Sequence, residues 1–344
     1  MSQKLLRRSI GIIPRISGTG GTASFQLKMQ HGLAERGIET THSLDEKSVN
    51  TALVIGGSRD LVGLWRAKRR GVRLFQRLDG INWIHRKRRT GLRHFLKAER
   101  ANLLLSWIRK HLADGVIYQS DFVHRWWESA YGPTNVQHAV IRNGVDLERY
   151  SPDGPQDRPT GVVRVLVVEG RLEGGYEIGL DHAIEFSTHL ARLHEGAVEL
   201  MIVGQVSDAL MRSAQNRSSV PLRWAGSVPR EAIPDLDRSA HLFFAADIHP
   251  ACPNAVIEAL ACGLPVVGFD TGALKEIVDA RSGQIVPYGA DPWGLERPDF
   301  EALARGALDV LQDLDTFRVG ARRRAEEEFG LDGMIQGYLE AMGW

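Results

Sequence analysis

Residues 245–278 read AADIHPACPNAVIEALACGLPVVGFDTGALKEIV, and this stretch decides the fold. It predicts a helix over Asn254–Cys262, with Pro253 at its start, where the missing N–H of proline would have had no partner. Gly263 then supplies the left-handed residue that closes a helix. The unbroken apolar run Pro265–Phe269 is typical of a strand buried on both faces of a parallel sheet. The stretch therefore predicts a strand–loop–helix–strand unit of an α/β protein.

This helix carries one charged residue, Glu258, on its second turn. Backbone N–H groups at a helix start, here those of Asn254 and Ala255, attract anions. A carboxylate beside them accepts hydrogen bonds from hydroxyls, as the acidic residue of a dinucleotide site does from a ribose. The arrangement predicts a site for a ribose next to a phosphate. The alternative is a well-capped core helix with one stray carboxylate.

The block from Glu258 to Val266, EALACGLPV, resembles the donor-site signature of the retaining GT4 glycosyltransferases. That signature has two glutamates eight positions apart, and the second opens the block. Pro250 stands at the position of the first. A second match is the string NGVD at 143–146 with YSP at 150–152, which resembles the family's N-G-V-D…F-x-P. The resemblance implies an α/β protein with the GT-B fold, in which two Rossmann-like, doubly wound domains face a cleft.

The domain organisation is predicted from the chain length and from a segment rich in Pro and Gly. A chain of 344 residues favours two domains, and alternating strand-like and helical runs predict parallel sheets. Residues 151–161, SPDGPQDRPTG, contain no aliphatic residue and are typical of a linker. We expect an acceptor-side domain over 1–155 and a nucleotide-sugar-binding domain over 156–330. A last helix is expected over 331–344, and the resemblance implies that it crosses back to the first domain.

The formal net charge of +1 hides an asymmetry, since residues 1–155 carry a balance of +13 and the remainder −12. Residues 66–110 hold 15 Lys and Arg against Asp79 and Glu99, with Trp and Leu interleaved. Basic amphipathic segments of this kind favour membrane interfaces. The segment therefore predicts peripheral contact with an anionic membrane or a pyrophosphate-linked acceptor. The alternatives are a solvated basic surface and nucleic-acid binding. We expect no nucleic acid partner, because no nucleic-acid motif accompanies the charge.

The cysteines and the apolar runs bear on the compartment. Cys252 and Cys262 have neither metal-ligand nor disulfide spacing, which predicts buried thiols in a reducing compartment. The apolar run Ile10–Ile13 is too short for a signal peptide, and no stretch approaches the roughly 20 apolar residues of a spanning helix. These features predict a cytoplasmic protein, which the basic segment would bring to the inner face of the plasma membrane.

The first half of the chain offers three kinds of candidate. Gly20 and Gly21 follow a strand-like run over 9–16 and resemble the family's G-G, which borders the cleft near the donor phosphates. Asp79 follows a strand-like run, at the end where ligands meet parallel sheets. The family often has a His or His-Asp pair there, so Asp79 is a candidate catalytic residue and His85 a weaker candidate. The alternative for Asp79 is ordinary Asp-Gly turn chemistry.

Arg171 ends the first strand-like run of the second half. A guanidinium can bind a diphosphate through two parallel hydrogen bonds. Arg171 matches the Arg of the family string G-R-L-x-x-x-K-G, in which Arg and Lys hold the donor's distal phosphate. Ile178 stands where the Lys is expected. Asp247 and His249, in the loop that lacks the first glutamate, are weaker candidates for the sugar hydroxyls.

The resemblance implies two further donor contacts. Val228 lies in a turn that faces the nucleobase in the family, and Thr271 lies in the family's small-residue turn beside the donor. The alternative in both cases is an ordinary turn.

The reaction implied is transfer of a sugar from a UDP- or GDP-linked donor to a hydroxyl of a glycan or lipid-linked acceptor. The anomeric configuration is expected to be retained, and the setting is polysaccharide or glycolipid assembly. Arg171 would be catalytic because preorganised donors stabilise a leaving diphosphate. We expect no metal and no cofactor. The alternatives are a catalytically weakened GT-B-like protein that only binds nucleotide sugars, and a phosphorylase or epimerase on the same fold.

Overall fold

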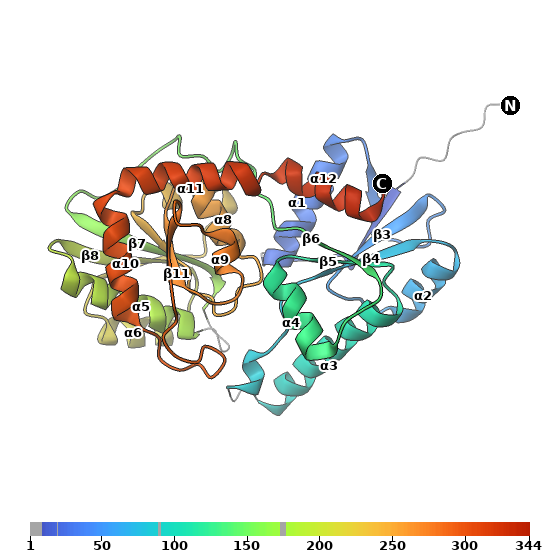
Figure 1. Cartoon of the computed structure of the whole chain (residues 1–344), viewed down its shortest axis with the longest axis horizontal. Coiled ribbons are helices and arrows are strands. Elements are labelled where there is room, and N and C mark those ends of the chain that lie inside the picture. Colours follow the sequence, from blue (N-terminus) through green and yellow to red (C-terminus); the bar gives the residue numbers. More distant parts are fainter. Residues whose placement is uncertain (1–8, 19, 89–90, 173–176) are drawn as a thin grey trace. The chain divides into compact units, whose positions relative to one another are not determined.

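The computed structural model describes residues 9–18, 20–88, 91–172 and 177–344. The chain divides into two compact units (Figure 1). Unit 1 combines the residues up to Trp83 with Gly91–Asn143 and Leu331–Trp344. Unit 2 combines Ile84–Thr90 with Gly144–Gly330. Each unit contains a six-stranded sheet of its own.

The sheet of unit 1 has the strand order β2-β1-β3-β4-β5-β6, and its strand pairs are parallel. β1 is shorter than the predicted strand over 9–16, because Pro14 has no N–H to donate to a sheet. The strands are β1 (Ser9–Ile13), β2 (Glu39–Thr41), β3 (Val49–Ile55), β4 (Arg73–Leu78), β5 (Gly115–Tyr118) and β6 (Gln137–Val140).

Helices cover both faces of this sheet. The helices of unit 1 are α1 (Gly21–Glu35), α2 (Leu61–Arg69), α3 (Leu92–His111), α4 (Asp121–Tyr131) and α12 (Leu331–Met342). α1 and α12 pack together on one face, with Phe25 and Tyr338 in the buried cluster, and α2 and α3 pack on the other through Leu64 and Ile108. The α1–α12 contact is close, since a Cβ on Gly32 would lie 2.7 Å from Ile335. The last helix of the chain therefore completes the core of unit 1.

The sheet of unit 2 has the order β12-β11-β10-β7-β8-β9, again with parallel pairs. The predicted α/β class with doubly wound parallel sheets is thus confirmed. The strands are β7 (Val162–Arg171), β8 (Ala197–Gln205), β9 (Leu222–Gly226), β10 (Leu242–Phe244), β11 (Val266–Phe269) and β12 (Gly283–Val286). The helices are α5 (Glu177–Leu193), α6 (Asp208–Arg217), α7 (Ile233–Arg238), α8 (Asn254–Ala261), α9 (Leu274–Ile277), α10 (Phe300–Gln312) and α11 (Leu314–Glu328), with 3₁₀ turns η1 (Ile84–Arg86) and η2 (Arg230–Ala232).

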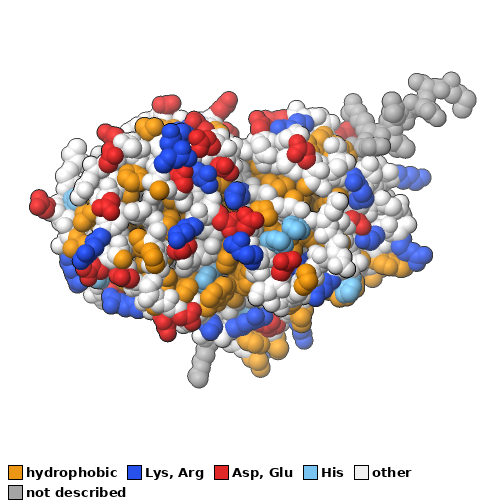
Figure 2. Space-filling model, in the orientation of Figure 1, with side chains coloured by type: hydrophobic (Ala, Val, Ile, Leu, Met, Phe, Trp, Pro, Cys, Tyr) orange, Lys and Arg blue, Asp and Glu red, His pale blue; other side chains and the backbone are white. Residues whose placement is uncertain are grey.

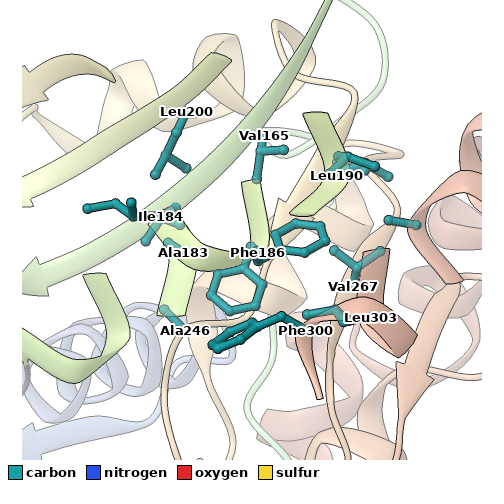
Figure 3. Packing of buried hydrophobic residues seen from close by; sticks show 14 of the residues in the cluster. Val165, Ala183, Ile184, Phe186, Leu190, Leu200, Ala246, Val267, Phe300 and Leu303 are labelled. Carbon is teal, nitrogen blue, oxygen red and sulfur yellow. The ribbon is translucent and has the colours of Figure 1, made fainter. Parts of the chain in front are cut away.

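One face of this sheet packs against α5 and α10 (Figure 3). Phe186 of α5 stacks on Phe244 of β10 with ring centroids 5.2 Å apart. Phe300 and Leu303 of α10 lie against Val267 of β11 in the same cluster. This cluster fixes the strands whose ends carry the candidate site residues.

The predicted helix after β10 is present as α8, with Pro253 before it. Gly263 follows with φ +68°, as expected of the residue that closes a helix. Residues 151–161 lie inside unit 2. Arg238 Nη1 donates to the Ser151 carbonyl at 2.8 Å and its Nε to the Pro155 carbonyl at 3.0 Å. These bonds bind a segment with linker composition to the body of the unit.

Several large apolar side chains of α3 remain exposed, namely Leu92, Phe95, Leu96, Leu103 and Trp107. In the part of the chain that the structure describes, no helix combines the length and hydropathy needed to cross a bilayer.

Asp237 of α7 is fully buried, and neither carboxyl oxygen has a hydrogen-bond partner of normal geometry among the described residues. Burial and the nearby charge of Glu258 raise its pKa well above the ordinary value. The folded state therefore binds a proton that the unfolded state releases. This contribution to stability is complete below the unfolded pKa of about 3.9 and is lost as the pH rises toward the folded pKa.

We expect Asp237→Asn to be more stable than the wild type at pH 8 by on the order of 1–3 kcal/mol in urea unfolding, because it removes the cost of protonating a carboxylate on folding. Near pH 4 the two midpoints should converge. The matched control is Asp309→Asn, at an exposed aspartate of α10, whose difference from the wild type should not change with pH. If the wild type and Asp237→Asn were equally stable at every pH, the raised pKa of Asp237 would be contradicted.

Candidate functional site

The strand order of unit 2 reverses between β7 and β10, since the chain runs outward from β7 in one direction and from β10 in the other. Ligands of open α/β sheets bind at the carboxyl ends of the strands beside such a switch point. Arg171 ends β7, Asp247 follows β10, and Thr271 follows β11. The topology therefore brings these three predicted residues to one edge of the sheet.

A β-bulge changes the direction of the backbone near the end of β7. The β7–β8 register shifts between Val168 and Arg171. A side chain at Gly204, which has φ +141°, would collide with the carbonyl of Glu169. Bulges are frequent beside active sites, where they redirect a side chain. Arg171 is exposed. Ile178, which stands in place of the family's Lys, is half-buried on the first turn of α5. Part of the intervening string, 173–176, lies outside the described residues.

Two carboxyl groups meet at the switch point. Burial and the nearby Asp247 carboxylate raise the pKa of the half-buried Glu169 to about 8. Desolvation raises the pKa of Asp247 as well. Each of the two carboxyl groups therefore keeps its proton to a higher pH than an ordinary acidic side chain does. Sequence reasoning missed Glu169, whose one signal was a carboxylate at the end of an apolar strand.

α8 begins directly after the loop that follows β10. Asn254 and Ala255 form its first turn and are half-buried, so the amides predicted to bind phosphate lie at the helix start. Glu258 is half-buried on the next turn. Burial and the charge of Glu258 raise the pKa of Tyr150, which shows that this carboxylate lies near Tyr150. The charge of Glu258 also acts on the buried Asp237 carboxyl, and its part in binding a ribose stays a prediction.

The loop that lacks the first glutamate has a defined conformation. His249 adopts φ +60°, which is uncommon for a residue with a side chain. Its ring is buried and stacks on Trp293 with centroids 3.6 Å apart. Burial lowers the pKa of His249 to about 4, so the imidazole is neutral at physiological pH. The carbonyl of Pro250 accepts a hydrogen bond from the Ala273 amide at 2.8 Å.

That bond joins the loop to the turn that carries Thr271. Gly272, with φ +58°, is packed so closely against His249 and Pro250 that a Cβ would overlap their backbone. Thr271 is buried at 6% exposure. Val228 is half-buried after β9, which is separated from β10 by the two strands β7 and β8. The structure thus joins the Asp247–Pro250 loop to Thr271, and it leaves Val228 at a more distant strand end.

The candidates of unit 1 also lie at a carboxyl edge. Gly20 precedes α1 and Gly21 begins it, after β1, at the point where the order of this sheet reverses. Asp79 follows β4 directly, and Arg77 Nη1 donates to its Oδ1 at 2.6 Å. His85 is buried in η1, which groups with unit 2. The structure therefore assigns Asp79 and His85 to different units.

Two observations concern other chemistries. Cys252 and Cys262 are both buried free thiols. Within the described residues, no group of three or more His, Cys, Asp and Glu side chains is arranged to hold a metal ion.

Comparison with known proteins extends these observations. Residues 163–313 match the family Glycosyl transferases group 1. The chain is 28% identical over 262 residues to alpha-maltose-1-phosphate synthase of Mycolicibacterium smegmatis, covering 68% of this chain and 65% of that protein. It is 32% identical over 222 residues to a GDP-mannose-dependent alpha-(1-6)-phosphatidylinositol dimannoside mannosyltransferase of Mycobacterium tuberculosis, covering 62% and 53%. The chain thus spans only part of the length of these relatives.

The solved structure of Anabaena Alr3699/HepE in complex with UDP-glucose has a similar fold. The TM-score is 0.70 at 16% identity, over 97% of this chain and 99% of that one. At this identity the likeness establishes the fold alone. With two parallel Rossmann-like sheets, the EALACGLPV block and the match over 163–313, the chain is similar to GT4-type glycosyltransferases of the GT-B fold, and its second unit carries the match to the group 1 glycosyltransferases.

Proposed function

We propose that the protein is a retaining glycosyltransferase that moves a hexosyl group from a nucleotide diphosphate sugar to a hydroxyl acceptor in glycan or glycolipid assembly. One observation carries the proposal: Arg171, the start of α8 and the half-buried Glu258 follow strands that meet at the switch point of unit 2. A cation, a helix N-terminus and a carboxylate provide the partners that a diphosphate and a ribose need.

In this proposal each residue has a defined part. Arg171 and the amides of Asn254 and Ala255 bind the diphosphate, and Glu258 binds the ribose hydroxyls. Val228 and Thr271 contact the donor. A relative described as GDP-mannose-dependent supports a GDP-linked donor, and a UDP-linked donor is proposed beside it because a protein of the same fold was solved with UDP-glucose.

The sugar would lie near Asp247 and His249. The donor contacts of Gly20 and Gly21 stay a prediction. A neutral imidazole donates and accepts hydrogen bonds without attracting a second phosphate, which suits His249 to sugar hydroxyls. The proposal includes metal independence and no cofactor. A guanidinium and a helix N-terminus supply positive charge at the leaving diphosphate, where preorganised electrostatics accelerate departure.

Two positions favour a second candidate function. Pro250 and Ile178 replace the acid and the base expected from the family pattern, and neither side chain can bind a hydroxyl or a phosphate. A protein with these replacements could retain nucleotide-sugar binding and lose most of its turnover. The alternative is therefore a catalytically weakened nucleotide-sugar-binding protein.

A donor panel separates these functions. UDP-glucose, UDP-N-acetylglucosamine and GDP-mannose are tested for binding by calorimetry and for nucleotide release, with and without 1 mM EDTA. We expect one donor to bind and release nucleotide at a rate that EDTA leaves unchanged. Glu258→Gln should weaken its binding about 10- to 100-fold, the value of one hydrogen bond to a charged group. The control is Glu195→Gln at an exposed loop glutamate, which should bind normally. Binding without release would favour the second candidate, and binding of no donor would contradict both.

Removal of the proposed diphosphate ligand should affect turnover more than affinity. We expect Arg171→Ala to lower kcat by about 10²-fold or more, the effect of losing one preorganised donor to developing charge. Arg171→Lys should lose less, since it keeps the charge without the two-pronged geometry. Arg192→Ala, at an exposed arginine of α5, is the matched control. A loss of less than threefold for Arg171→Ala would remove Arg171 from the mechanism.

We further propose that the N-terminal end of α3, residues 92–97, docks on an anionic membrane and brings the protein to the inner face of the plasma membrane. Leu92 is 74% exposed, and Phe95 and Leu96 are exposed beside Arg93 and Lys97. Figure 2 shows orange and blue side chains gathered at the lower edge of the view, where this end of α3 lies in Figure 1. Apolar groups that insert among lipids and cations that pair with anionic headgroups act together in such surfaces.

Vesicle sedimentation tests this contact. Vesicles of phosphatidylcholine with 30% phosphatidylglycerol should bind the wild type at 50 mM salt, and 500 mM salt should weaken the binding because it screens the charges. The triple variant Leu92→Ser, Phe95→Ser and Leu96→Ser should bind about tenfold less, since it removes the inserted apolar groups. Val319→Ser, at an exposed valine of α11, is the control. Equal binding of the triple variant and the wild type would refute the proposed surface.

A further inference from the structure

Arg77 is a buried cation at the carboxyl end of β4. Its side chain is 2% exposed, and its guanidinium lies over the Phe25 ring of α1 at 3.9 Å from the centroid. Burying a charge is unfavourable unless it is paired and hydrogen-bonded, and an apolar residue of similar size would often be more stable. The presence of Arg77 inside unit 1 therefore calls for an explanation from its partners.

The guanidinium joins two polar side chains from separate parts of the chain. Nη1 donates to Asp79 Oδ1 at 2.6 Å, and Nη2 donates to Asn143 Oδ1 at 2.9 Å. Asn143 Nδ2 in turn donates to Gln119 Oε1 at 3.1 Å, and Gln119 Nε2 donates to Asp79 Oδ1. These four side chains form a closed ring of hydrogen bonds, which we call the Asp79 ring. Its members follow or end the neighbouring strands β4, β5 and β6.

The ring leaves one oxygen of Asp79 unused. Both donors reach Oδ1, and within the described residues no donor reaches Oδ2. The Asp79 side chain is 39% exposed, whereas Gln119 and Asn143 are buried at 3% and 4%. The ring therefore holds the carboxylate from the inside and turns Oδ2 toward the outside.

The backbone of Asp79 is fixed as well. Trp127 Nε1 donates to the Asp79 carbonyl at 2.7 Å. The ring of Trp126 lies so near the next residue that a Cβ on Gly80 would come within 2.9 Å of it. Side chain and main chain are thus held together, a degree of order that an ordinary surface turn does not need.

We propose that Arg77, with Gln119 and Asn143, positions Asp79 so that Oδ2 accepts a hydrogen bond from the hydroxyl of a neutral polyol or sugar acceptor. This inference rests on the proposed glycosyltransferase function. A carboxylate accepts hydrogen bonds from hydroxyls and repels phosphate, so the acceptor group at this position is uncharged. Arg77 does not touch the acceptor; it acts through Asp79 and is a positioning residue.

A purely structural ring would hold the ends of β4, β5 and β6 together without any effect on the acceptor. The two roles differ in a double-mutant cycle. If Arg77 acts through Asp79, its replacement has no further effect on catalysis once Asp79 is lost. If it only stabilises unit 1, the two losses multiply.

The experiment measures nucleotide release from UDP-glucose and from GDP-mannose with myo-inositol as the probe acceptor. The variants are Arg77→Met, Asp79→Asn and the double variant. We expect each single variant to lower kcat/KM for the acceptor about 10- to 100-fold, the value of one hydrogen bond to a charged group. The double variant should be no slower than the slower single variant, and Arg77→Lys should recover part of the loss. UDP binding by calorimetry should change less than twofold, because the ring lies in unit 1.

Two further variants keep the test sound. Arg73→Met replaces an exposed arginine four residues before Arg77 on the same strand, where it lies over Phe75, and should behave as the wild type. Gln119→Met removes one donor to Oδ1 and leaves the Arg77–Asp79 ion pair, so it serves if Arg77→Met does not fold. It should lower acceptor kcat/KM about three- to tenfold, less than loss of the charged pair.

The outcomes separate this inference from the function on which it rests. Losses that multiply in the double variant, or Arg77→Met and Gln119→Met variants that fold with wild-type acceptor kcat/KM, would overturn the positioning role alone. A wild type that releases nucleotide from neither donor would overturn the proposed function and this inference with it.

Discussion

The parallel pairing of strands in both sheets is the constraint on which the rest of the structure depends. A parallel sheet must bury both faces, so its strands are apolar and helices cover them on each side. Polar side chains that bind ligands are left to the strand ends and the loops beyond them. Parallel strands also end at the same edge, and residues far apart in the sequence meet there. Arg171 and Asp247 share such an edge in unit 2, as Gly20 and Asp79 do in unit 1.

A few charged side chains are nevertheless buried in the two units. They differ in how many of their polar atoms have hydrogen-bond partners. Arg164 of β7 pairs with Glu199 of β8 at 2.7 Å and donates to the Ser239 carbonyl at 3.3 Å, within strands and away from the carboxyl edge. Glu199 also accepts a hydrogen bond from Arg223 of β9, so this group is satisfied between strands and is explained by packing. Arg77 pairs with Asp79 Oδ1 and Asn143 inside unit 1, and Asp79 keeps its Oδ2 available for a hydroxyl, as expected of a carboxylate prepared for a ligand.

The loop after β10 departs from the family pattern in a way that the structure makes intelligible. Pro250 replaces a glutamate, and its carbonyl is bound by Ala273. The left-handed conformation of His249 is held by stacking on Trp293. Unusual backbone of this kind persists when its surroundings hold it, and it is frequent at ligand sites. The sugar end of the proposed donor site is therefore organised by a neutral ring and the Glu169–Asp247 pair, where the family has a carboxylate.

The sequence by itself determined the fold class, the two sheets and the position of α8. These follow from local signals: apolar runs, the proline and glycine at the ends of α8, and a block of nine residues that resembles one family. It also named Asp79 and Arg171, because a charged residue at the end of an apolar strand is visible without a structure, and Glu258, because it is the one charge on the predicted helix. It did not reveal the partners of those residues. Arg77 and Asn143 are 66 positions apart, and Asp79 and Gln119 are 40 apart.

Only the tertiary structure could decide these pairings, since they depend on strand order, which spacing along the chain does not encode. The same reason explains Glu169 and Asp237. Both are single acidic residues in unremarkable sequence, and their raised pKa values arise from burial and from carboxylates brought near by folding. Local propensity thus fixed the elements, and the packing of those elements fixed the chemical environment of each charged group.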